Sequence, residues 1–388
     1  MRAPFCLLGV VALGWLSGQP ARPVLPGDPL PGITAAEFEL FRIGLEDFSE
    51  VEGASDGLGP AFNGTGCSSC HSVPAVGGMT SMTEVRAGYV DDDGKFSVLN
   101  GGTLYPLFSI PNHLCQVVIP EEANVIARRM PIPLFGDGLI EAISDATILA
   151  LEDPDDRNGD GIRGRAARIV DPASRRERIG RFGWKAQQAT LLSFSGDAYR
   201  NEMGITNDIF PDEYAPGIDE AKMKLCSPKR GIEDVRNRRT GLRAIDNFTN
   251  FMRLLAPPAR GPINDDVRNG AQIFASVGCA ACHTPTLMTA ENANPVFDRK
   301  PVDLFSDLLL HDVGTGDGIE QDGAAANEIR TPPLWGLRIR KPFLHDGSAG
   351  SIEEAIRRHG GEAASPVTRY RDLSARDSAR LMAFLKSL

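Results

Sequence analysis

Two stretches decide the fold of this 388-residue chain: Cys67-Ser-Ser-Cys70-His71 and Cys279-Ala-Ala-Cys282-His283. In each stretch, two cysteines three positions apart are followed directly by a histidine. A helical turn brings residues i and i+3 to the same side, so both sulfur atoms can reach one edge of a planar ligand. Attachment of haem c requires two thiols that add to vinyl groups and an imidazole that binds iron. The pattern therefore predicts two covalent haem c groups, with His71 and His283 as iron ligands.

A C-x-x-C pair also occurs in redox-active dithiols and as half of a zinc site. Neither needs a histidine directly after the second cysteine, whereas both copies here have one. Haem attachment is therefore the favoured interpretation. Cysteines bound to haem cannot take part in thiol–disulfide exchange, which disfavours a thiol–disulfide enzyme.

Each motif follows a predicted helix. The first helix spans 34–51 and opens with a capping box formed by Thr34 and Glu37. Its apolar face has four residues at helical spacing, which are Phe38, Phe41, Leu45 and Phe48. The second helix spans 264–276, and its inward residues are Val267, Ile273 and Phe274.

An apolar helix also closes each segment. Residues 244–255 carry an apolar face made by Ile245, Phe248, Met252 and Leu255. Pro257 and Pro258 stop this helix. Residues 374–388 form the second closing helix, with Leu381, Leu385 and Leu388 inward. A helix, a haem motif, loops and a closing helix make a cytochrome c module, and the order appears twice.

The expected fold is mainly α, with two cytochrome c-like domains. The first domain spans 33–257 and the second spans 262–388, with a boundary near the prolines at 257–262. About a hundred residues between 101 and 241 exceed a bare cytochrome c module, and we expect them to form long inserted loops.

The chain begins with the pattern of an export signal. Arg2 precedes an apolar run over 5–16, and small and turn-forming residues follow. We therefore expect a signal peptide over 1–20, cleaved near 18–22, and a periplasmic protein. No later apolar run approaches the length that spans a bilayer. The formal charge of −10 argues against nucleic acid as a partner.

A helix over 351–359 carries a candidate ligand for the second iron. It opens with a predicted Ser351/Glu354 capping box and ends before two glycines. Its inward stripe, at positions i, i+3, i+4 and i+7, consists of Ile352, Ala355, Ile356 and His359. An imidazole on an apolar stripe needs a partner, and iron is favoured here over a backbone carbonyl alone.

The chain resembles the di-haem oxidoreductase family, whose members are peroxidase-like or thiol oxidoreductase-like proteins with two cytochrome c haem sites. This family lies within the wider group of bacterial di-haem cytochrome c peroxidases and the methylamine-dehydrogenase-maturation enzyme. The similarity runs in order along nearly the whole mature chain. The matching stretches cover residues 62–71, 133–142, 180–186, 306–312, 331–335, 343–347 and 359–362.

The resemblance also bears on His359. In the peroxidase relatives, a residue fourteen positions after the histidine of an H-D-G motif binds the second iron. It is methionine in typical peroxidases and tyrosine in the maturation enzyme. Counted from His345, that position is His359. Bis-histidine ligation gives a lower potential than methionine/histidine ligation, which puts the usual peroxidase donor and substrate in question.

The resemblance leaves the sixth ligand of the first iron open. The peroxidases carry a histidine sixteen residues after the first haem histidine, and this position is Ala87 here. The site is either open, as peroxide binding requires, or closed by His113 or Met82. An open site needs an acid to move protons. Glu141 is the candidate, and a surface helix acid is the alternative interpretation.

Four further aromatic residues have two interpretations each. His311 and His345 precede aspartates in polar turns, and we expect them to hydrogen bond to haem propionates or iron ligands. A structural role is the alternative. For Trp184 and Trp335, core packing is the default, and an electron relay between the haems is the alternative.

Two other features are left open. Asp156, Asn158 and Asp160 resemble the first half of a calcium loop, but Ala167 stands where a bidentate acid is expected. A hydrogen-bonded turn is the alternative. The peroxidase relatives hold calcium near the residues before H-D-G, here around Arg340 and Pro342. Cys115 and Cys226 are a candidate disulfide in an oxidising compartment.

The expected function is that of a periplasmic di-haem c-type oxidoreductase, similar to cytochrome c peroxidases. Electrons from a redox partner protein or small donor would enter through the C-terminal haem and reach a reactive N-terminal haem, which hydrogen peroxide or another small oxidant would bind. The alternatives are a non-catalytic electron-transfer cytochrome and a maturation-type enzyme that oxidises a partner protein.

Overall fold

A computed structural model describes residues 22–110, 114–227 and 231–388. The predicted signal peptide at 1–20 and the candidate ligand His113 lie outside the described residues.

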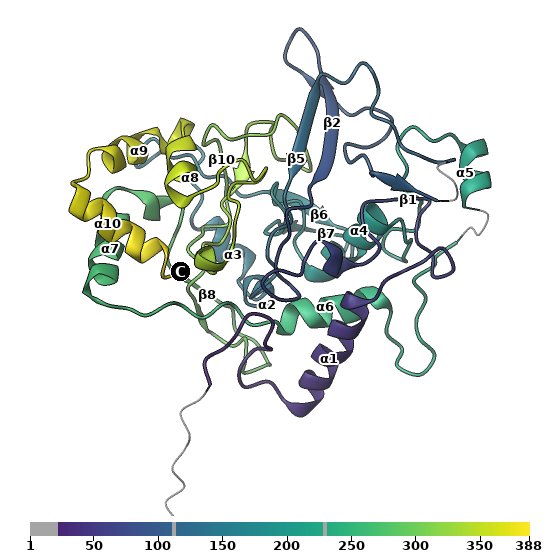
Figure 1. Cartoon of the computed structure of the whole chain (residues 1–388), viewed down its shortest axis with the longest axis horizontal. Helices are drawn as coiled ribbons and strands as arrows, with labels where there is room; N and C mark the ends of the chain where they lie inside the picture. Colours follow the sequence, from purple (N-terminus) through teal and green to yellow (C-terminus); the bar gives the residue numbers. More distant parts are fainter. Residues whose placement is uncertain (1–21, 111–113, 228–230) are drawn as a thin grey trace, which may run out of the picture.

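The described chain contains ten α-helices, joined by long connections (Figure 1). Their bounds are α1 Ala35–Ser49, α2 Asp137–Glu141, α3 Asp145–Leu149, α4 Leu191–Met203, α5 Glu220–Cys226, α6 Ala244–Leu254, α7 Asp265–Ser276, α8 Ile352–Arg358, α9 Ala364–Arg371 and α10 Ala375–Leu385. Short 3₁₀ turns include η1 Cys67–Ser69, η2 Cys279–Ala281, η3 Leu337–Ile339 and η4 Gly361–Ala363.

Short strands lie between the helices, so the fold is mixed and not mainly α as the sequence suggested. Their bounds are β1 Ala61–Phe62, β2 Glu84–Val90, β3 Phe96–Ser97, β4 Phe108–Ser109, β5 Val125–Arg129, β6 Arg168–Asp171, β7 Arg176–Ile179, β8 Leu287–Met288, β9 Pro301–Val302, β10 Leu310–His311 and β11 Ile329–Arg330. The pairs are β1–β4, β6–β7, β8–β9 and β10–β11, and β2 lies between β3 and β5. All pairs are antiparallel.

Much of the strand content lies in the long segment between 101 and 241 or next to it. In the largest sheet, Glu84 pairs with Arg129 and Gly88 pairs with Val125. Arg129 and Val85 point to opposite faces of this sheet and are 2% and 5% exposed, so residues are buried on both faces. The inserted segment is therefore partly sheet, which its short and irregular apolar alternation did not reveal.

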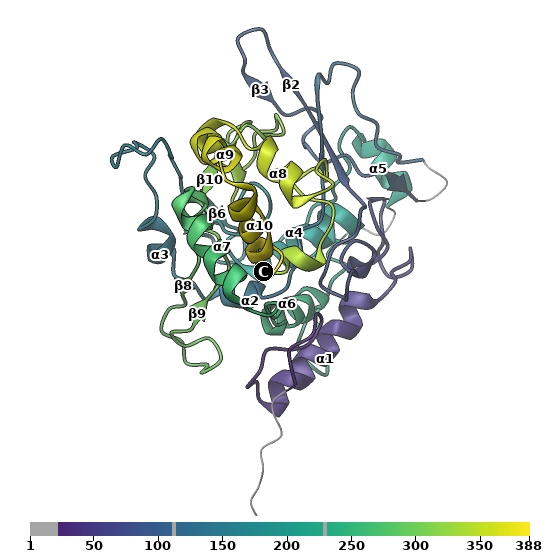
Figure 2. The ribbon, with the colours of Figure 1, turned by 60° about the vertical axis from the view of Figure 1, so that its left-hand side comes forward.

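Two pairs of helices form the frame of the structure. Helix α1 packs against α6, and α7 packs against α10, as Figures 1 and 2 both show. The Thr34/Glu37 capping box predicted for α1 is present, with both reciprocal hydrogen bonds. Asn264 caps α7 and Ser374 caps α10 through their side chains. The four helices predicted next to the motifs are thus confirmed to within a few residues at each end.

A glycine sits at the crossing point of each helix pair. A Cβ added to Gly44 on α1 would overlap the carbonyl oxygen of Asn247 and lie 2.9 Å from Cβ of Phe251 on α6. A Cβ added to Gly270 on α7 would overlap the carbonyl oxygen of Arg380 and lie 2.7 Å from Cβ of Phe384 on α10. The same close approach of two backbones therefore occurs twice in the chain.

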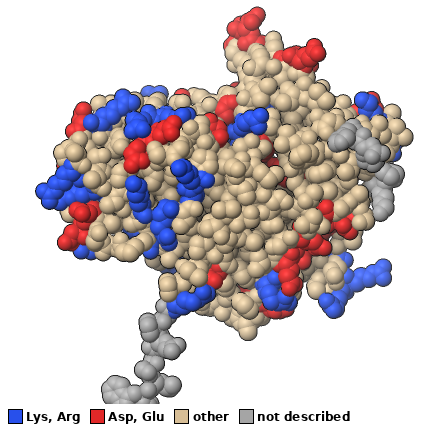
Figure 3. All heavy atoms as spheres, in the orientation of Figure 1, with Lys and Arg blue, Asp and Glu red and all other residues tan. Residues whose placement is uncertain are grey.

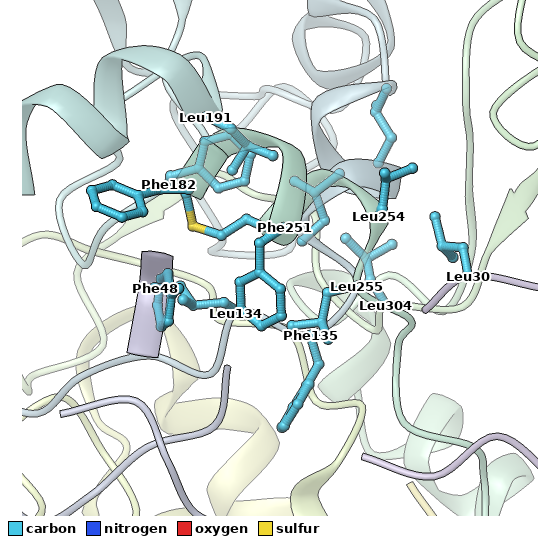
Figure 4. Packing of buried hydrophobic residues seen from close by; sticks show 14 of the residues in the cluster. Leu30, Phe48, Leu134, Phe135, Phe182, Leu191, Phe251, Leu254, Leu255 and Leu304 are labelled. Carbon is cyan, nitrogen blue, oxygen red and sulfur yellow. The ribbon is translucent and has the colours of Figure 1, made fainter. Parts of the chain in front are cut away.

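Phe251 is the centre of the larger core (Figure 4). Its ring centroid lies 5.3 Å from that of Phe41 and 4.9 Å from that of Phe48, both on α1. Phe38, which the helical pattern placed on the same face, is 49% exposed, and the buried residues of α1 are Phe41, Gly44 and Phe48.

The larger core also reaches across the sequence position predicted as a boundary. Residues from the C-terminal part of the chain that join it include Leu287, Val302, Leu304, Leu308 and Leu309. A smaller core surrounds Phe274 and Phe384 of the second helix pair. The two cores, which differ in size, therefore each contain residues from the segment that follows the second motif.

Cys115 and Cys226 form a disulfide across a sequence separation of 111 residues. The bond connects the segment after β4 to α5, within the inserted part of the chain. Among the described residues, no helix is both long and apolar enough to cross a membrane.

We predict that Gly44→Ala lowers the free energy of unfolding by about 1–3 kcal/mol, because the added methyl group forces α1 away from α6. Gly270→Ala should have a similar effect at the α7–α10 crossing. Unfolding by guanidinium chloride, followed by circular dichroism, measures both. Gly350→Ala is the control, since its Cβ would meet only Glu354, at 3.6 Å. Equal stability of the Gly44→Ala, Gly350→Ala and unmodified proteins would contradict the crossing argument.

Candidate functional site

The first motif forms a tight turn that fixes His71. In η1, the carbonyl oxygen of Cys67 accepts hydrogen bonds from the amides of Cys70 and His71, at 3.2 and 3.1 Å. His71 Nδ1–H donates to the carbonyl oxygen of Gly78 at 3.0 Å, because a carbonyl can only accept. Burial lowers the pKa of His71 to about 4. The imidazole is therefore neutral, and its Nε2 lone pair is available to a metal.

The second motif repeats this arrangement. The amide of His283 donates to the carbonyl oxygen of Cys279 at 3.0 Å, and His283 Nδ1–H donates to the carbonyl oxygen of Phe305 at 3.0 Å. Burial, which dominates over the Phe305 hydrogen bond, lowers the pKa of His283 to about 4. The four cysteines of the two motifs form no disulfides.

His359 follows α8 and faces the same cavity as His283. Its Nδ1–H donates to the carbonyl oxygen of Ala355 at 2.7 Å, and burial lowers its pKa. The four residues of the predicted inward stripe of α8, His359 included, line this cavity. Ser351 caps α8, but the Glu354 carboxylate accepts from the amide of Gly350, so the predicted capping box is only half formed.

A large cavity adjoins each motif. The first, beside His71, encloses about 1560 Å³ not filled by atoms, and the second, beside His283, about 1490 Å³, each including space open to solvent. Six residues line both cavities, so the two share a wall: Met130, Pro131, Pro133, Trp184, Arg330 and Arg340.

Two cations in the shared wall suit a bound anion. Arg330 is 2% exposed, and its guanidinium donates to the backbone oxygens of Gly183 and Thr331, at 2.7 and 3.3 Å. Burial lowers the pKa values of Arg330 and Arg340 to about 10. Neither has a carboxylate within ion-pair distance in the described parts of the chain. Buried cations without a paired anion are costly, and the carboxylates of haem would satisfy them.

The first cavity is lined by two partly buried carboxyl groups, those of Glu84 and Glu202. Arg86 donates two hydrogen bonds to Glu84, at 2.6 and 3.2 Å, and Asn63 donates to Glu202 at 2.7 Å. Burial and the adjacent charge of Glu84 raise the pKa of Glu202. Burial alone would raise the pKa of Glu84, but the charges of Arg86 and Arg129 more than offset it and lower that pKa. Glu202 is therefore the protonated partner, and it donates a hydrogen bond to Glu84.

Two other acids line this cavity. Burial raises the pKa of Asp197 to about 6, although Arg200 and Arg86 act against it. Burial also raises the pKa of Asp137 well above its usual range. The first cavity therefore contains several carboxyl groups whose pKa values burial raises.

Glu141, the predicted acid, has a different position. One carboxylate oxygen accepts from the amide of Leu191 at 2.8 Å, and the other accepts from Arg253 at 2.7 Å. The residue is not among those that line either cavity. Its oxygens cap α4 and hold α6, so this structure does not support a role in proton transfer.

Sequence reasoning missed the acids that line the first cavity and the role of the two arginines in the shared wall. Glu84 and Arg86 are separated by two positions and so share one face of a strand, but the strand itself was not recognised. Asp137 and Arg330 lie within or directly before the stretches 133–142 and 331–335 that carry the family resemblance. Asp137, one of two acids in the mainly apolar stretch 133–142, was a usable signal, whereas Glu202, in the middle of a long insertion, gave none.

The structure places one of the two candidates for the sixth position of the first iron, since His113 lies outside the described residues. Met82 lines the first cavity and is 40% exposed. Ala87 is fully buried in β2 and is not among the cavity residues. In the described residues, His71 is the one histidine that lines the first cavity, whereas His283, His311, His345 and His359 line the second.

Trp184 and His345 meet in and near the shared wall. The indole N–H of Trp184 donates to the carbonyl oxygen of Met130 at 2.7 Å, and its ring lies edge-on to His345 with centroids 6.1 Å apart. The amide of Met130 donates in turn to the carbonyl oxygen of His345 at 2.7 Å. Trp335 lines the first cavity and packs against Gly136.

The candidate calcium loop uses its oxygens within itself. Asp156 accepts from the amide of Gly161, Asn158 from the amide of Asp160, and Asp160 from the amide of Ile162. Ala167, at the position of the missing acid, is fully buried. These are the contacts of a hydrogen-bonded turn, so the calcium interpretation is not supported.

His311 is held between two carboxylates beside the second motif. Its Nε2–H donates to Asp307 and its Nδ1–H donates to Glu362, both at 2.8 Å, and it is 2% exposed. Its Nδ1 also lies 3.7 Å from Sγ of Cys282. Burial alone would lower the pKa of His311, but the charge and hydrogen bond of Asp307, together with Glu362, raise it well above the usual range. His311 is therefore a buried imidazolium.

We predict that His311→Asn lowers the free energy of unfolding by about 3 kcal/mol near pH 6, because it leaves two buried carboxylates without a cation. The pKa of His311 is higher in the folded protein than in the unfolded chain, where it is about 6.5. Its contribution to the free energy of unfolding is therefore complete below the unfolded-state pKa, and it is lost as the pH rises through the folded-state pKa. The difference between the two proteins should therefore shrink at alkaline pH. Guanidinium chloride unfolding at several pH values measures it. A difference that stayed constant from pH 6 to pH 10 would exclude the imidazolium.

Two curated proteins are similar to parts of this chain in sequence. The methylamine utilization protein MauG of Methylorubrum extorquens is 30% identical over 136 residues, which are 32% of this chain and 35% of that protein. Cytochrome c551 peroxidase of Nitrosomonas europaea is 22% identical over 129 residues, which are 33% of this chain and 36% of that protein. The chain thus matches about a third of the length of these curated relatives.

Solved structures show a distant similarity. A MauG-like protein associated with microbial copper homeostasis superposes with a TM-score of 0.44 and 15% identity, over 97% of this chain and 95% of that one. The diheme peroxidase BthA of Burkholderia thailandensis gives a TM-score of 0.40 and 14% identity, over 90% of this chain and 86% of that one.

A family model described as "di-haem oxidoreductase, putative peroxidase" matches residues 114–388. This match covers well over half of the chain. It includes the second motif, His359 and most of the residues that line the first or the second cavity. The chain therefore belongs to the di-haem oxidoreductase family.

Proposed function

We propose that the chain is a periplasmic di-haem c-type oxidoreductase of the peroxidase-like type. Cys67, Cys70 and His71 would hold one haem, and Cys279, Cys282 and His283 the other. In this proposal the haem modules are two cytochrome c-like domains at 33–257 and 262–388. The iron of a bound haem supplies one-electron chemistry and, where a coordination position is free, a site for peroxide.

Among the described residues, the unequal supply of imidazoles to the two cavities is the observation that carries the proposal. The second cavity offers His283 and His359, both with Nδ1 bound to a backbone carbonyl and Nε2 free. The first offers His71 and, as a further candidate ligand, the thioether of the half-exposed Met82. We infer that the second site serves electron transfer and that the first keeps a position for an oxidant.

The shared wall supports transfer of electrons between the sites. Trp184 lines both cavities, and its indole N–H is fixed by the carbonyl oxygen of Met130 at 2.7 Å. Arg330 and Arg340, also in this wall, would bind the haem carboxylates and orient both groups toward it. We propose that electrons enter at the His283/His359 site and reach the His71 site across this wall.

Glu202 would supply the proton that reduction of a peroxide requires. Its carboxyl group is partly buried, lines the first cavity and donates to the Glu84 carboxylate, which Arg86 keeps ionised. A carboxyl group that keeps its proton at neutral pH is suited to general acid catalysis. The proton would leave a Glu202 carboxyl oxygen, and Asn63 would hold the resulting carboxylate by its 2.7 Å hydrogen bond.

Electron paramagnetic resonance of the oxidised, fully loaded protein tests the proposal. We expect one low-spin signal from the bis-histidine site and one high-spin ferric signal that changes when hydrogen peroxide is added. Two low-spin signals that stay unchanged by peroxide, before and after half-reduction, would contradict the proposal and favour a pure electron carrier. Turnover with a protein substrate but not with peroxide would favour a maturation-type enzyme.

We predict that Glu202→Gln slows the reaction with peroxide by about 10²–10⁴-fold, because the amide cannot donate a proton. Because the raised pKa keeps the acid protonated, the rate of the unmodified protein should fall as pH rises through that pKa, and the variant should lack this dependence. Stopped-flow absorbance measures both. Glu141→Gln is the matched control, and a larger loss in the control than in Glu202→Gln would restore the role first assigned to Glu141.

A further inference from the structure

Charge is distributed unevenly along the chain. Residues 331–388 contain ten lysines and arginines and six acids, a net charge of +4. Since the whole chain carries −10, the other 330 residues carry −14. The last 58 residues, which include α8, α9 and α10, are therefore a basic part of an acidic protein.

The basic residues of this part are exposed and available. Lys341, Arg357 and Arg371 are exposed, and so is Arg376, and none of the four has an ion pair within the described residues. Exposed arginines elsewhere are often neutralised, as Arg42 is by Glu39 and Glu46 on α1. Figure 3 shows lysine and arginine side chains spread over the part of the molecule where Figure 1 places α7 to α10. We call the surface of α8, α9 and α10 the basic face.

The basic face covers the second cavity. Ile352 and Ile356 of α8, and Val367 and Tyr370 of α9, line this cavity from inside, while Arg357 and Arg371 of the same helices point outward. Arg369 of α9 lies against the second motif, because a Cβ on Gly278 would be 2.5 Å from its guanidinium. It also donates to the carbonyl oxygen of Val277 at 2.9 Å. Positive charge thus lies next to Cys279, at the edge where a haem would be attached.

The first motif has the opposite surroundings. The amide of Glu52 donates to the carbonyl oxygen of Thr65 at 2.7 Å, and the backbone of Glu50 is in close contact with Gly66. Glu46 and Glu50 are exposed nearby, at the end of α1. Acidic side chains also gather near α1 in Figure 3. A negatively charged partner would therefore be attracted to the second motif and repelled from the first.

We infer that the basic face is the docking surface for a soluble redox protein that carries acidic side chains around its own redox centre. This inference rests on the proposed function, because it names the electron donor of the second site. Complementary charge speeds encounter and selects the partner and its orientation. One electron would leave the reduced partner, which is oxidised, and reduce the iron of the second haem, with no bond made or broken. The net charge of the whole chain disfavours an extended polyanion as the occupant.

The test uses the fully loaded protein and two probes, a reduced acidic c-type cytochrome and a reduced basic c-type cytochrome. Stopped-flow absorbance gives the second-order rate of haem reduction, without peroxide, at about 10 mM and about 1 M salt, where the screening lengths are about 30 and 3 Å.

The variant Arg357→Glu/Arg371→Glu reverses two charges of the basic face. Arg238→Glu/Arg239→Glu is the control, with the same charge change in the exposed loop before α6. Line broadening in the magnetic resonance spectrum of the oxidised acidic probe measures binding alone.

We expect the acidic probe to react faster than the basic one at low salt, and this preference to vanish at high salt. The basic-face variant should slow the acidic probe about tenfold or more at low salt and weaken its line broadening, while the control stays close to the unmodified protein. Reduction by hydroquinone should be unchanged in both variants, which shows that the haem sites are intact.

Equal rates for the two probes, a faster basic probe, or equal losses in variant and control would overturn the inference. So would binding to vesicles of anionic lipid that the basic-face variant abolishes while the probe rates stay the same, since the face would then serve a membrane surface. Because peroxide is absent from these measurements, a protein without peroxidase activity can still pass the test, and an active peroxidase can still fail it.

Discussion

A hydrogen bond from an imidazole Nδ1–H to a backbone carbonyl recurs at three histidines proposed as iron ligands. His71 donates to Gly78, His283 to Phe305 and His359 to Ala355, at 3.0, 3.0 and 2.7 Å. The bond fixes the tautomer and the direction of the ring, so that Nε2 carries the free lone pair. Burial keeps the rings neutral, which a metal ligand requires. Haem binding, the difference between the two sites and the proposed path of electrons depend on these bonds.

The helix pairs hold these bonds in place. Glycine at each crossing lets two backbones approach, and the aromatic residues beside it reach the motif: Phe48 lies 6.3 Å from the ring of His71, and Phe274 lies 6.4 Å from the ring of His283. The inserted segment then adds what a bare module lacks. It brings Glu202 on α4 to the first cavity, and its strand β5 pairs with β2, which carries Glu84 and Arg86 at the same cavity. The frame is therefore repeated, and the chemistry that distinguishes the sites comes largely from the insertion.

Local patterns in the sequence predicted the parts that depend on local chemistry. Capping residues and apolar spacing located α1, α6, α7, α8 and α10, because a helix shows its start and its buried face within one segment. The pairing of Cys115 with Cys226 was a candidate and is present. The strands around β2 were missed because their pairing connects distant segments. Glu141 hydrogen bonds to Leu191 and Arg253, which are distant in sequence, so no local pattern could show that it does not line either cavity. The Glu84–Glu202 pair also joins residues that no local pattern relates.

Attachment of both porphyrins through thioethers is the claim on which all other proposals rest. The intact mass of the denatured protein, after production in a host that attaches haem c, tests it most directly. The account predicts the mass of the mature polypeptide plus two haems, retained under denaturing and reducing conditions. A mass equal to the polypeptide alone, or to the polypeptide with one haem, would contradict it.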